Sequence, residues 1–404
     1  MASLTRRAFG VASRGAALAT AGGVRPAGAS WLGNLLQGGR GMTESGGVRL
    51  KQIASVDFRK EENQFAWHVS SMAWSPDGSR LVAESGDGSF LNVIDTASWQ
   101  LLTRFRVMQT RRARLFGFAA GGRELIASRH ISSGSTENPP AFSVFETDTG
   151  KLLRESDLLP VFLPELLGRP QDLFLQQRRS VQSLTVSPDS RYVFLSFSAI
   201  GVRGNTTHRF FGLVFDSRNG RLLGQIEGRN WLLPSISRDN RLAVATSATR
   251  LGFSDEIAIF DLPSLTERVS FRAHVRGVRS LAWSPAGDRL ASGSSSTVPP
   301  REAEPIRVWD TSTGEQMAGF PGEFEPIAYL NWHPSGRFFL TSSAKGTGEI
   351  GALVQLFPAS GGAPLLQHFA PDRVVINGPC FCPRTGRLAW FQQGQILIHE
   401  IQGL

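Results

Sequence analysis

The chain has few of the residues that stabilise or anchor several common classes of protein. It contains only two cysteines in 404 residues. A single residue separates Cys380 from Cys382, a spacing that does not allow an unstrained disulfide, so a disulfide scaffold is excluded. No stretch reaches the roughly 18 uninterrupted apolar residues that a membrane-spanning helix needs, and we expect no transmembrane segment in the mature chain.

Charge is also scarce, and lysine is especially rare. Charged residues form 19% of the chain, and only Lys51, Lys60, Lys151 and Lys345 are lysines among 43 basic residues. The formal net charge is +9, but five arginines precede Glu44, the first acidic residue. Much of the excess charge therefore lies in the N-terminal tail, and we expect no nucleic-acid partner.

The sequence lacks the short motifs that mark common catalytic and metal sites. H-E-x-x-H, C-x-x-C, the P-loop and G-x-S-x-G are all missing, and the seven histidines are dispersed. We therefore expect no catalytic residue, no metal site and no cofactor. Cys380 and Cys382 replace an alanine and a serine of the repeat described below, so we expect them to be buried structural thiols.

Glycine and proline are abundant, with 43 and 22 residues, and 41% of the chain is apolar. The apolar fraction is sufficient for a sizeable core, and the glycines follow no Gly-X-Y period, so collagen and general disorder are disfavoured. This composition favours short strands joined by turns.

The N-terminus has the three parts of an export signal. A basic segment precedes a short apolar stretch, and the small residues Ala27 and Ala29 mark a cleavage site after residue 29. The segment around Arg6 and Arg7 resembles the twin-arginine (Tat) signature of bacterial exported proteins. A signal over residues 1–29 would be followed by a glycine-rich linker over residues 30–47. The alternatives are a mitochondrial transit peptide and an intracellular protein that starts at Met42.

From residue 48 onward one unit is repeated seven times. Each copy has a strand that ends in a tight turn, usually centred on proline, and is followed by an apolar strand, as in MAWSPDGSRLVAES from residue 72. The proline or its equivalent lies at residues 76, 120, 188, 238, 285, 334 and 383. The period is about 44 to 50 residues apart from one long interval, which indicates a repeat array with one insertion.

A second marker follows each turn: an alternating apolar strand closed, in most copies, by an acidic residue. The copy at residues 306–314 reads IRVWDTSTG, and an Ala-His pair at residue 274 opens the same unit. These residues resemble the WD repeat. The resemblance covers residues 48–404 and implies an all-β, seven-bladed propeller with four-stranded antiparallel blades. It also implies that His274, Trp309 and Asp310 belong to the structural hydrogen-bond network of such repeats.

The two ends of the array predict how the ring closes. The last copy lacks an outer strand, and residues 48–58 alternate at period two and precede the first copy. We therefore expect this N-terminal strand to complete the last blade, which protects the free edge. Trp74, Trp283 and Trp332 recur at equivalent positions, so we expect them to pack between blades.

The long connections predict which face of the propeller binds a partner. The connections after the second strand of successive blades are long, and they all emerge on one face. The largest insertion, at about residues 158–179, also lands there. Long connections on one face, held by rigid blades, indicate that this face is the functional surface. The insertion is either a lid over the channel mouth or a docking site. Candidate contact residues are Leu163, Leu166, Leu167, Phe174, Arg178, Arg179, Arg203, His208, Arg209 and Arg301.

The sequence thus favours an exported, periplasmic propeller that acts as a non-enzymatic platform for a protein partner. The chief alternative is a periplasmic enzyme or ligand-binding propeller of the lactonase or quinoprotein and haem kind, with its site at the channel mouth. A cluster of Asp, Glu and His at that mouth would favour the enzyme. The third alternative, an intracellular scaffold from Met42, changes only the compartment.

Replacing Arg6 and Arg7 together by lysine tests the export signal. A Tat receptor reads the arginine pair, so we expect the unmodified protein to appear in the periplasm with Ser30 as its first residue and the double variant to stay in the cytoplasm. Intact-mass and N-terminal analysis of the two fractions measures this. A cytoplasmic form that starts near Met42 in both proteins would contradict export.

Overall fold

The structure is a computed structural model, and residues 41–404 form one compact unit within it. The predicted signal residues Arg6, Arg7, Ala27 and Ala29 lie outside the described residues. The residues described are 42–44, 47–58, 69–86, 88–107, 116–128, 142–156, 178–200, 208–228, 233–246, 255–275, 277–294, 303–320, 326–344, 352–370 and 376–404.

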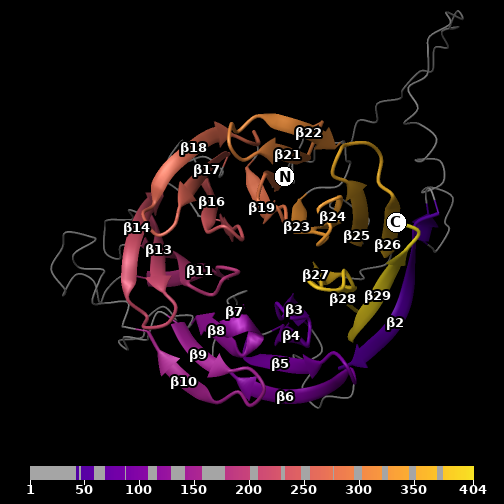
Figure 1. The fold of residues 1–404 in the computed structure, drawn as a ribbon, viewed down its shortest axis with the longest axis horizontal. Helices are drawn as coiled ribbons and strands as arrows, with labels where there is room; N and C mark the ends of the chain where they lie inside the picture. Colours follow the sequence, from indigo (N-terminus) through magenta and orange to yellow (C-terminus); the bar gives the residue numbers. More distant parts are fainter. Residues whose placement is uncertain are drawn as a thin grey trace, which may run out of the picture. The chain divides into compact units, whose positions relative to one another are not determined.

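Seven antiparallel sheets stand around a common centre, with their first strands innermost (Figure 1). This arrangement confirms the predicted seven-bladed β-propeller. Blades 1 to 3 consist of β3 (Val69–Trp74), β4 (Arg80–Ser85), β5 (Phe90–Asp95) and β6 (Gln100–Arg106); β7 (Phe116–Ala119), β8 (Glu124–Ser128), β9 (Phe142–Glu146) and β10 (Leu152–Glu155); and β11 (Arg178–Val186), β12 (Tyr192–Ile200), β13 (His208–Asp216) and β14 (Leu222–Gly228). A short 3-10 helix, η2 (Ala120–Gly122), joins β7 to β8.

The remaining blades follow the same order. Blades 4 to 7 consist of β15 (Leu233–Ile236), β16 (Arg241–Thr246), β17 (Glu256–Asp261) and β18 (Thr266–Arg272); β19 (Val278–Trp283), β20 (Arg289–Ser294), β21 (Ile306–Asp310) and β22 (Gln316–Phe320); β23 (Ile327–Trp332), β24 (Phe338–Ala344), β25 (Ala352–Pro358) and β26 (Leu366–Ala370); and β27 (Asn377–Phe381), β28 (Leu388–Gln392) and β29 (Gln395–Gln402) with β2 (Arg49–Asp57).

Burial explains why the middle strands of each blade are apolar runs rather than alternating sequences. In β4 and β5 nearly every residue is buried, because neighbouring blades cover both faces of the sheet. The outer strand β6 is mostly exposed or half-buried. The core therefore lies between blades, as in the cluster of Tyr192 and Phe194 of blade 3 with Leu242 and Val244 of blade 4.

The N-terminal strand closes the ring as the sequence predicts. β2 pairs antiparallel with β29, with Leu50 opposite Ile401 and Val56 opposite Ile396. Val56 and Phe58 are buried in the cluster between blades 7 and 1. Segments from the two ends of the repeat array thus share one sheet, and blade 7 gains its outer strand.

A further strand was missed by the sequence analysis, which assigned residues 30–47 to a linker. β1 (Met42–Glu44) pairs antiparallel with β26, with Thr43 opposite Gln367, and gives blade 6 a fifth strand. A strand added at a sheet edge is held by main-chain hydrogen bonds. It therefore needs no alternating pattern, and three residues leave no signal in the sequence.

The turn between the first and second strands of a blade is held by a serine and an aspartate. Ser75 Oγ donates to Asp77 Oδ1 at 2.6 Å and accepts from the Arg80 backbone N–H at 2.9 Å. Gly78 has a φ of +74°, a left-handed conformation that favours glycine. The same serine and aspartate pair recurs in blades 3 and 4, with Ser187 and Ser237.

The three repeated tryptophans pack between blades, as predicted, and each one bonds to the preceding blade. Their indole N–H groups donate to the backbone oxygens of innermost strands: Trp74 to Cys380 at 3.2 Å, Trp283 to Ser235 at 3.0 Å and Trp332 to Ala282 at 2.9 Å. These bonds fix the position of each ring, and all three tryptophans are buried.

Membrane insertion through a helix has no support in the part of the chain that the structure describes. That part holds no helix that is long and apolar enough to cross a bilayer.

Candidate functional site

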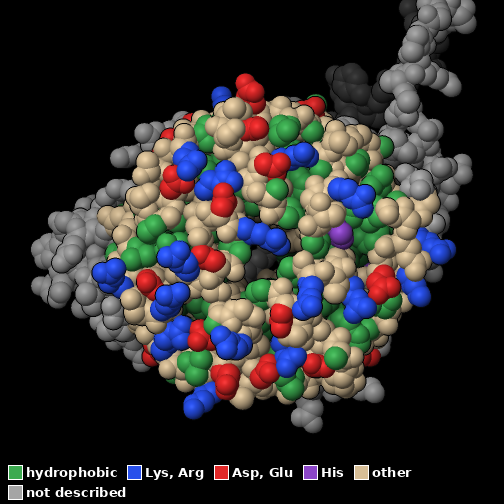
Figure 2. Space-filling view, viewed as in Figure 1, with side chains coloured by type: hydrophobic (Ala, Val, Ile, Leu, Met, Phe, Trp, Pro, Cys, Tyr) green, Lys and Arg blue, Asp and Glu red, His purple; other side chains and the backbone are tan. Residues whose placement is uncertain are grey.

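The antiparallel order of strands gives the propeller two different faces. The turns between first and second strands and between third and fourth strands emerge on one side, which we call the turn face. The other connections, including residues 129–141 and 157–177, start and end at strand termini on the opposite side, which we call the loop face. Figure 2 views the ring from the turn face, which is hollowed at its centre.

Six of the ten predicted partner-binding residues lie outside the described residues. These are Leu163, Leu166, Leu167, Phe174, Arg203 and Arg301. The other four were expected in connections, and the structure instead places them at strand ends, because β11, β12 and β13 extend further than the repeat pattern indicated. Arg178 and His208 pair with Ile200 from opposite sides, and Arg179 and Arg209 likewise flank Ala199. The backbones of these four residues thus meet at one end of blade 3.

The predicted network of the WD repeat is present in blade 5. Trp309 Nε1 donates to Ser292 Oγ at 2.8 Å, and His274 Nε2 lies 2.8 Å from the same oxygen. An indole N–H is a donor only, so the Ser292 hydroxyl accepts from Trp309, and it forms a second hydrogen bond with His274. Ser292 and His274 are fully buried. This network ties strands β20 and β21 to the segment that enters blade 5.

Asp310, the acidic residue of the Trp-Asp pair, caps a turn rather than joining that network. Its Oδ1 accepts from the backbone N–H groups of Ser312 at 2.8 Å and Thr313 at 3.1 Å. Hydrogen bonds from the Ser312 side chain and backbone lower the pKa of Asp310. Asp95 holds the corresponding turn of blade 1 through Ser98. The acidic residue at the end of the third strand is thus a structural element of the turn face.

The two cysteines are free and buried, as expected from their places in the repeat. Burial, together with the neighbouring Cys382, raises the pKa of the Cys380 thiol to about 12. A thiol with such a pKa stays protonated at neutral pH and is a poor nucleophile or metal ligand. Among the described residues no group of three or more His, Cys, Asp or Glu is placed to hold a metal ion.

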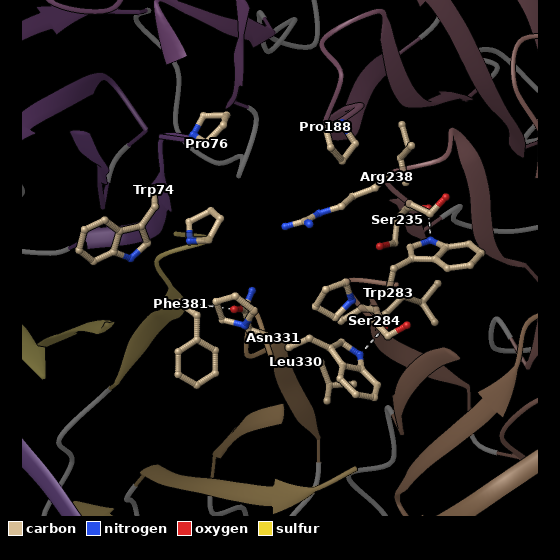
Figure 3. Close-up of a pocket in the computed structure, with 18 of the residues that line it drawn as sticks. Trp74, Pro76, Pro188, Ser235, Arg238, Trp283, Ser284, Leu330, Asn331 and Phe381 are labelled. Atoms are coloured by element: carbon tan, nitrogen blue, oxygen red, sulfur yellow. Dashed lines mark hydrogen bonds between the residues drawn. The ribbon is translucent and has the colours of Figure 1, made fainter. Parts of the chain in front are cut away.

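The hollow at the centre of the turn face is a cavity of about 680 Å³, which we call the funnel. Its wall comes from innermost strands and their turns, and it contains Trp74, Trp283, Trp332 and several prolines. Figure 3 shows Arg238 extending into the open centre of the funnel, with Asn331 and Phe381 on the far side. Among the described lining residues, Arg238 and Asp189 are the charged ones.

Asp189 is already fully bonded at the rim of the funnel. Its Oδ1 accepts from Ser187 Oγ at 2.7 Å and its Oδ2 from Asn240 Nδ2 at 2.7 Å. Partial burial raises the pKa of Asp189, but the hydrogen bonds from Ser187 and Asn240 outweigh this effect, so its pKa lies below the ordinary value. Asp189 is therefore an ionised turn residue, and general-acid chemistry would need a raised pKa.

The funnel was not among the sites predicted from the sequence, because the long connections were the feature that pointed to function. A signal was nevertheless present at position 238. Five repeats carry proline at the second position of the first turn, and blade 4 carries arginine there. A charged residue that replaces a recurring apolar one, at a position that faces the ring axis, is a candidate for binding.

Comparison with known proteins agrees with this fold. Residues 59–91 and 265–298 match the family model of the WD domain, G-beta repeat. The chain therefore contains WD repeats. The β-propeller domain of Cps50 (Swd1) from Myceliophteria thermophila aligns with 87% of this chain and 99% of its own, with a TM-score of 0.56 and 11% identity, a likeness of fold.

Curated relatives match only part of this chain. The ribosome biogenesis protein erb1 of Botryotinia fuckeliana is 32% identical over 29% of this chain and 14% of its own length. WD repeat-containing protein 90 of Xenopus tropicalis is 27% identical over 32% of this chain and 6% of its own. WD repeat-containing protein 1 of Rattus norvegicus is 26% identical over 37% of this chain and 24% of its own. In each case the match spans less than a quarter of the relative.

Replacing Ser292 by alanine tests the network in blade 5. The change leaves the indole N–H of Trp309 and the imidazole of His274 buried without their shared partner, so we expect a loss of about 2 to 4 kcal/mol in the free energy of unfolding. Denaturant unfolding measures it. The double variant Ser292→Ala, Trp309→Phe should lose about 1 kcal/mol less than the sum of the single changes. Strict additivity would contradict the coupling.

Proposed function

We propose that this protein is a non-enzymatic platform that binds a protein partner through its loop face. The WD-repeat propeller is a fold that typically serves as a protein-interaction scaffold. The observation that carries the proposal is the asymmetry of the two faces. Short turns such as 75–79 and 284–288 recur on the turn face, whereas the longest connections, such as 129–141, 157–177 and 295–305, all join strand ends of the loop face.

The rigidity of the blades supports this assignment. Each blade is a separate, fully paired antiparallel sheet, and the clusters between blades are built from fully buried side chains such as Phe194, Leu242 and Val354. Because such a scaffold is already rigid, binding a partner through its loops costs no conformational entropy in the scaffold itself. The mixed signs of charge along the long connections, with Glu137 and Glu302 beside arginines, suit a protein contact.

The alternative of an enzyme at the channel mouth receives less support. A catalytic site at the channel mouth would bring Asp, Glu and His side chains together, with pKa values shifted toward those that proton transfer needs. At the funnel the carboxyl group of Asp189 accepts hydrogen bonds from Ser187 and Asn240, and most of the described wall is apolar. The charged groups of this mouth therefore favour binding over bond-breaking chemistry.

We also propose that the platform acts in the periplasm after export through the twin-arginine route. Arg6 and Arg7, the following apolar stretch and the small residues Ala27 and Ala29 support this address. The arginine-to-lysine variant described above tests it independently of the partner.

The triple variant Leu163→Ser, Leu166→Ser, Leu167→Ser tests the loop face. If these leucines dock a partner, removing their apolar surface should reduce recovery of that partner about 10-fold or more in quantitative mass spectrometry of cross-linked envelope fractions. The matched control is Leu101→Ser, Leu102→Ser, which removes two exposed leucines from the outer strand β6.

We expect the control to recover the partner as the unmodified protein does, and all three proteins to have similar melting temperatures. Equal recovery by the triple variant would contradict docking at the insertion. Failure of the unmodified protein to enrich any protein over an untagged strain would contradict the platform itself.

A further inference from the structure

The rim of the funnel is built from one repeated position. In five blades the second residue of the first turn is a proline, and Pro76, Pro188 and Pro285 are among those that line the cavity. In blade 4 the same position is Arg238, so one cationic side chain enters an otherwise proline-lined rim.

The turn that carries Arg238 does not need this side chain for its own structure. Ser237 Oγ donates to Asp239 Oδ1 at 2.5 Å and accepts from the backbone N–H of Arg241 at 2.8 Å. Within the described chain the backbone N–H of Arg238 makes no hydrogen bond. Proline occupies the equivalent position in turns of the same kind. Residue 238 is therefore free to vary without loss of the fold.

The charge of Arg238 is left without a partner, in contrast to that of its neighbour. Arg241 donates to Asp239 Oδ2 at 2.8 Å and to the Gly287 backbone oxygen at 2.7 Å. Asp239, next to Arg238 in the sequence, accepts hydrogen bonds from Ser237 and Arg241. Asp189, at the rim, accepts them from Ser187 and Asn240. Arg238 makes no hydrogen bond or ion pair with any residue that the structure describes.

A second polar group of the funnel is also a free donor. The backbone N–H of Phe381 donates to Asn331 Oδ1 at 3.0 Å, which fixes the orientation of the Asn331 amide. The Asn331 NH₂ group therefore points toward the cavity, where Figure 3 shows it on the side facing Arg238. An arginine and an amide NH₂ across one cavity form a donor pair suited to a carboxylate.

The rest of the wall suits apolar side chains. The exposed rings of Pro76 and Pro188 and the half-buried ring of Pro285 offer apolar surface to a ligand, while the tryptophans behind them are buried between blades. Leu281 and Leu330 add to this surface. Apolar walls lower the local dielectric constant and strengthen a charge contact made inside them.

We propose that the funnel binds an extended segment of a partner protein that places one carboxylate between Arg238 and Asn331 and apolar residues against the prolines of the rim. A cavity of about 680 Å³ lies within the range of peptide-sized and ligand-sized sites. This inference extends the proposed platform function and assigns a second contact surface, on the face opposite the loops. The ionised Asp189 at the rim and the single arginine favour one negative charge over the double charge of a phosphate group.

Three immobilised libraries of eight-residue peptides test this site with the full-length protein. In the first, peptides are attached through their C-termini, so Asp and Glu carry the only carboxylates. In the second, peptides lack Asp and Glu and are attached through their N-termini, so the chain end is the only carboxylate. In the third, phosphoserine is the only acidic residue, and its attachment is also through the C-terminus.

We expect the unmodified protein to select peptides with an acid beside apolar residues from the first or the second library, which identifies the carboxylate as a side chain or a chain end. Arg238→Ala and Arg238→Pro should weaken binding of the selected peptides about 10-fold or more. Arg218→Ala, which removes an exposed arginine from another turn of the same face, should leave binding unchanged.

Arg238→Pro restores the residue found in the other repeats, so its melting temperature should stay within about 2 °C of the unmodified protein. Selection from the phosphoserine library alone, equal binding by the Arg238 variants, or no selection from any library would overturn the proposal. None of these outcomes affects the partner recovered through Leu163, Leu166 and Leu167, so failure at the funnel is distinguishable from failure of the platform.

Discussion

The antiparallel pairing of β2 with β29 is the constraint on which the rest of the propeller depends. A blade buries apolar residues on both faces, so every sheet needs a neighbour on each side, and an open ring would expose the faces of blades 7 and 1. The buried cluster of Val56, Phe58, Trp74 and Ile398 lies at this junction. Closure also fixes the radius at which the innermost strands stand, and therefore the width of the funnel and the spacing of the loops on the opposite face.

The turns on one face show how a repeat can stay constant in structure while its chemistry varies. In blade 4 the serine and the aspartate, Ser237 and Asp239, carry the hydrogen bonds of the turn, and the residue between them points away from those bonds. Selection at that position is therefore independent of folding, and arginine replaces proline without a structural cost. The loop face achieves variation differently, through connections of unequal length. A propeller of this kind offers two surfaces that can change separately on one rigid ring.

The sequence predicted the architecture well because each repeat carries strong local signals. The Ser-Pro-Asp turn, the strand that ends in Trp309 and Asp310, and the alternating N-terminal strand each have a direct physical cause in turn geometry or burial. It missed β1 because edge pairing leaves no side-chain pattern, and it began β11 and β13 too late because Arg178 and His208 look like loop residues. Arg238 was visible as a missing proline, but its lack of a partner depends on distances between blades. Contacts between blades depend on the folded structure and produce no recurring spacing in the sequence.

The most direct test of this account is a disulfide across the closing pair, in the variant Ser55→Cys, Leu397→Cys. Ser55 lies opposite Leu397 in the register of β2 and β29, so the two thiols should oxidise readily. The cross-link would join the two ends of the propeller and raise its melting temperature, since it restricts the unfolded chain. The offset pair Ser55→Cys, Glu400→Cys should not form it. Two thiols that remain open to alkylation in the folded Ser55→Cys, Leu397→Cys protein would contradict closure of the ring by its N-terminal strand.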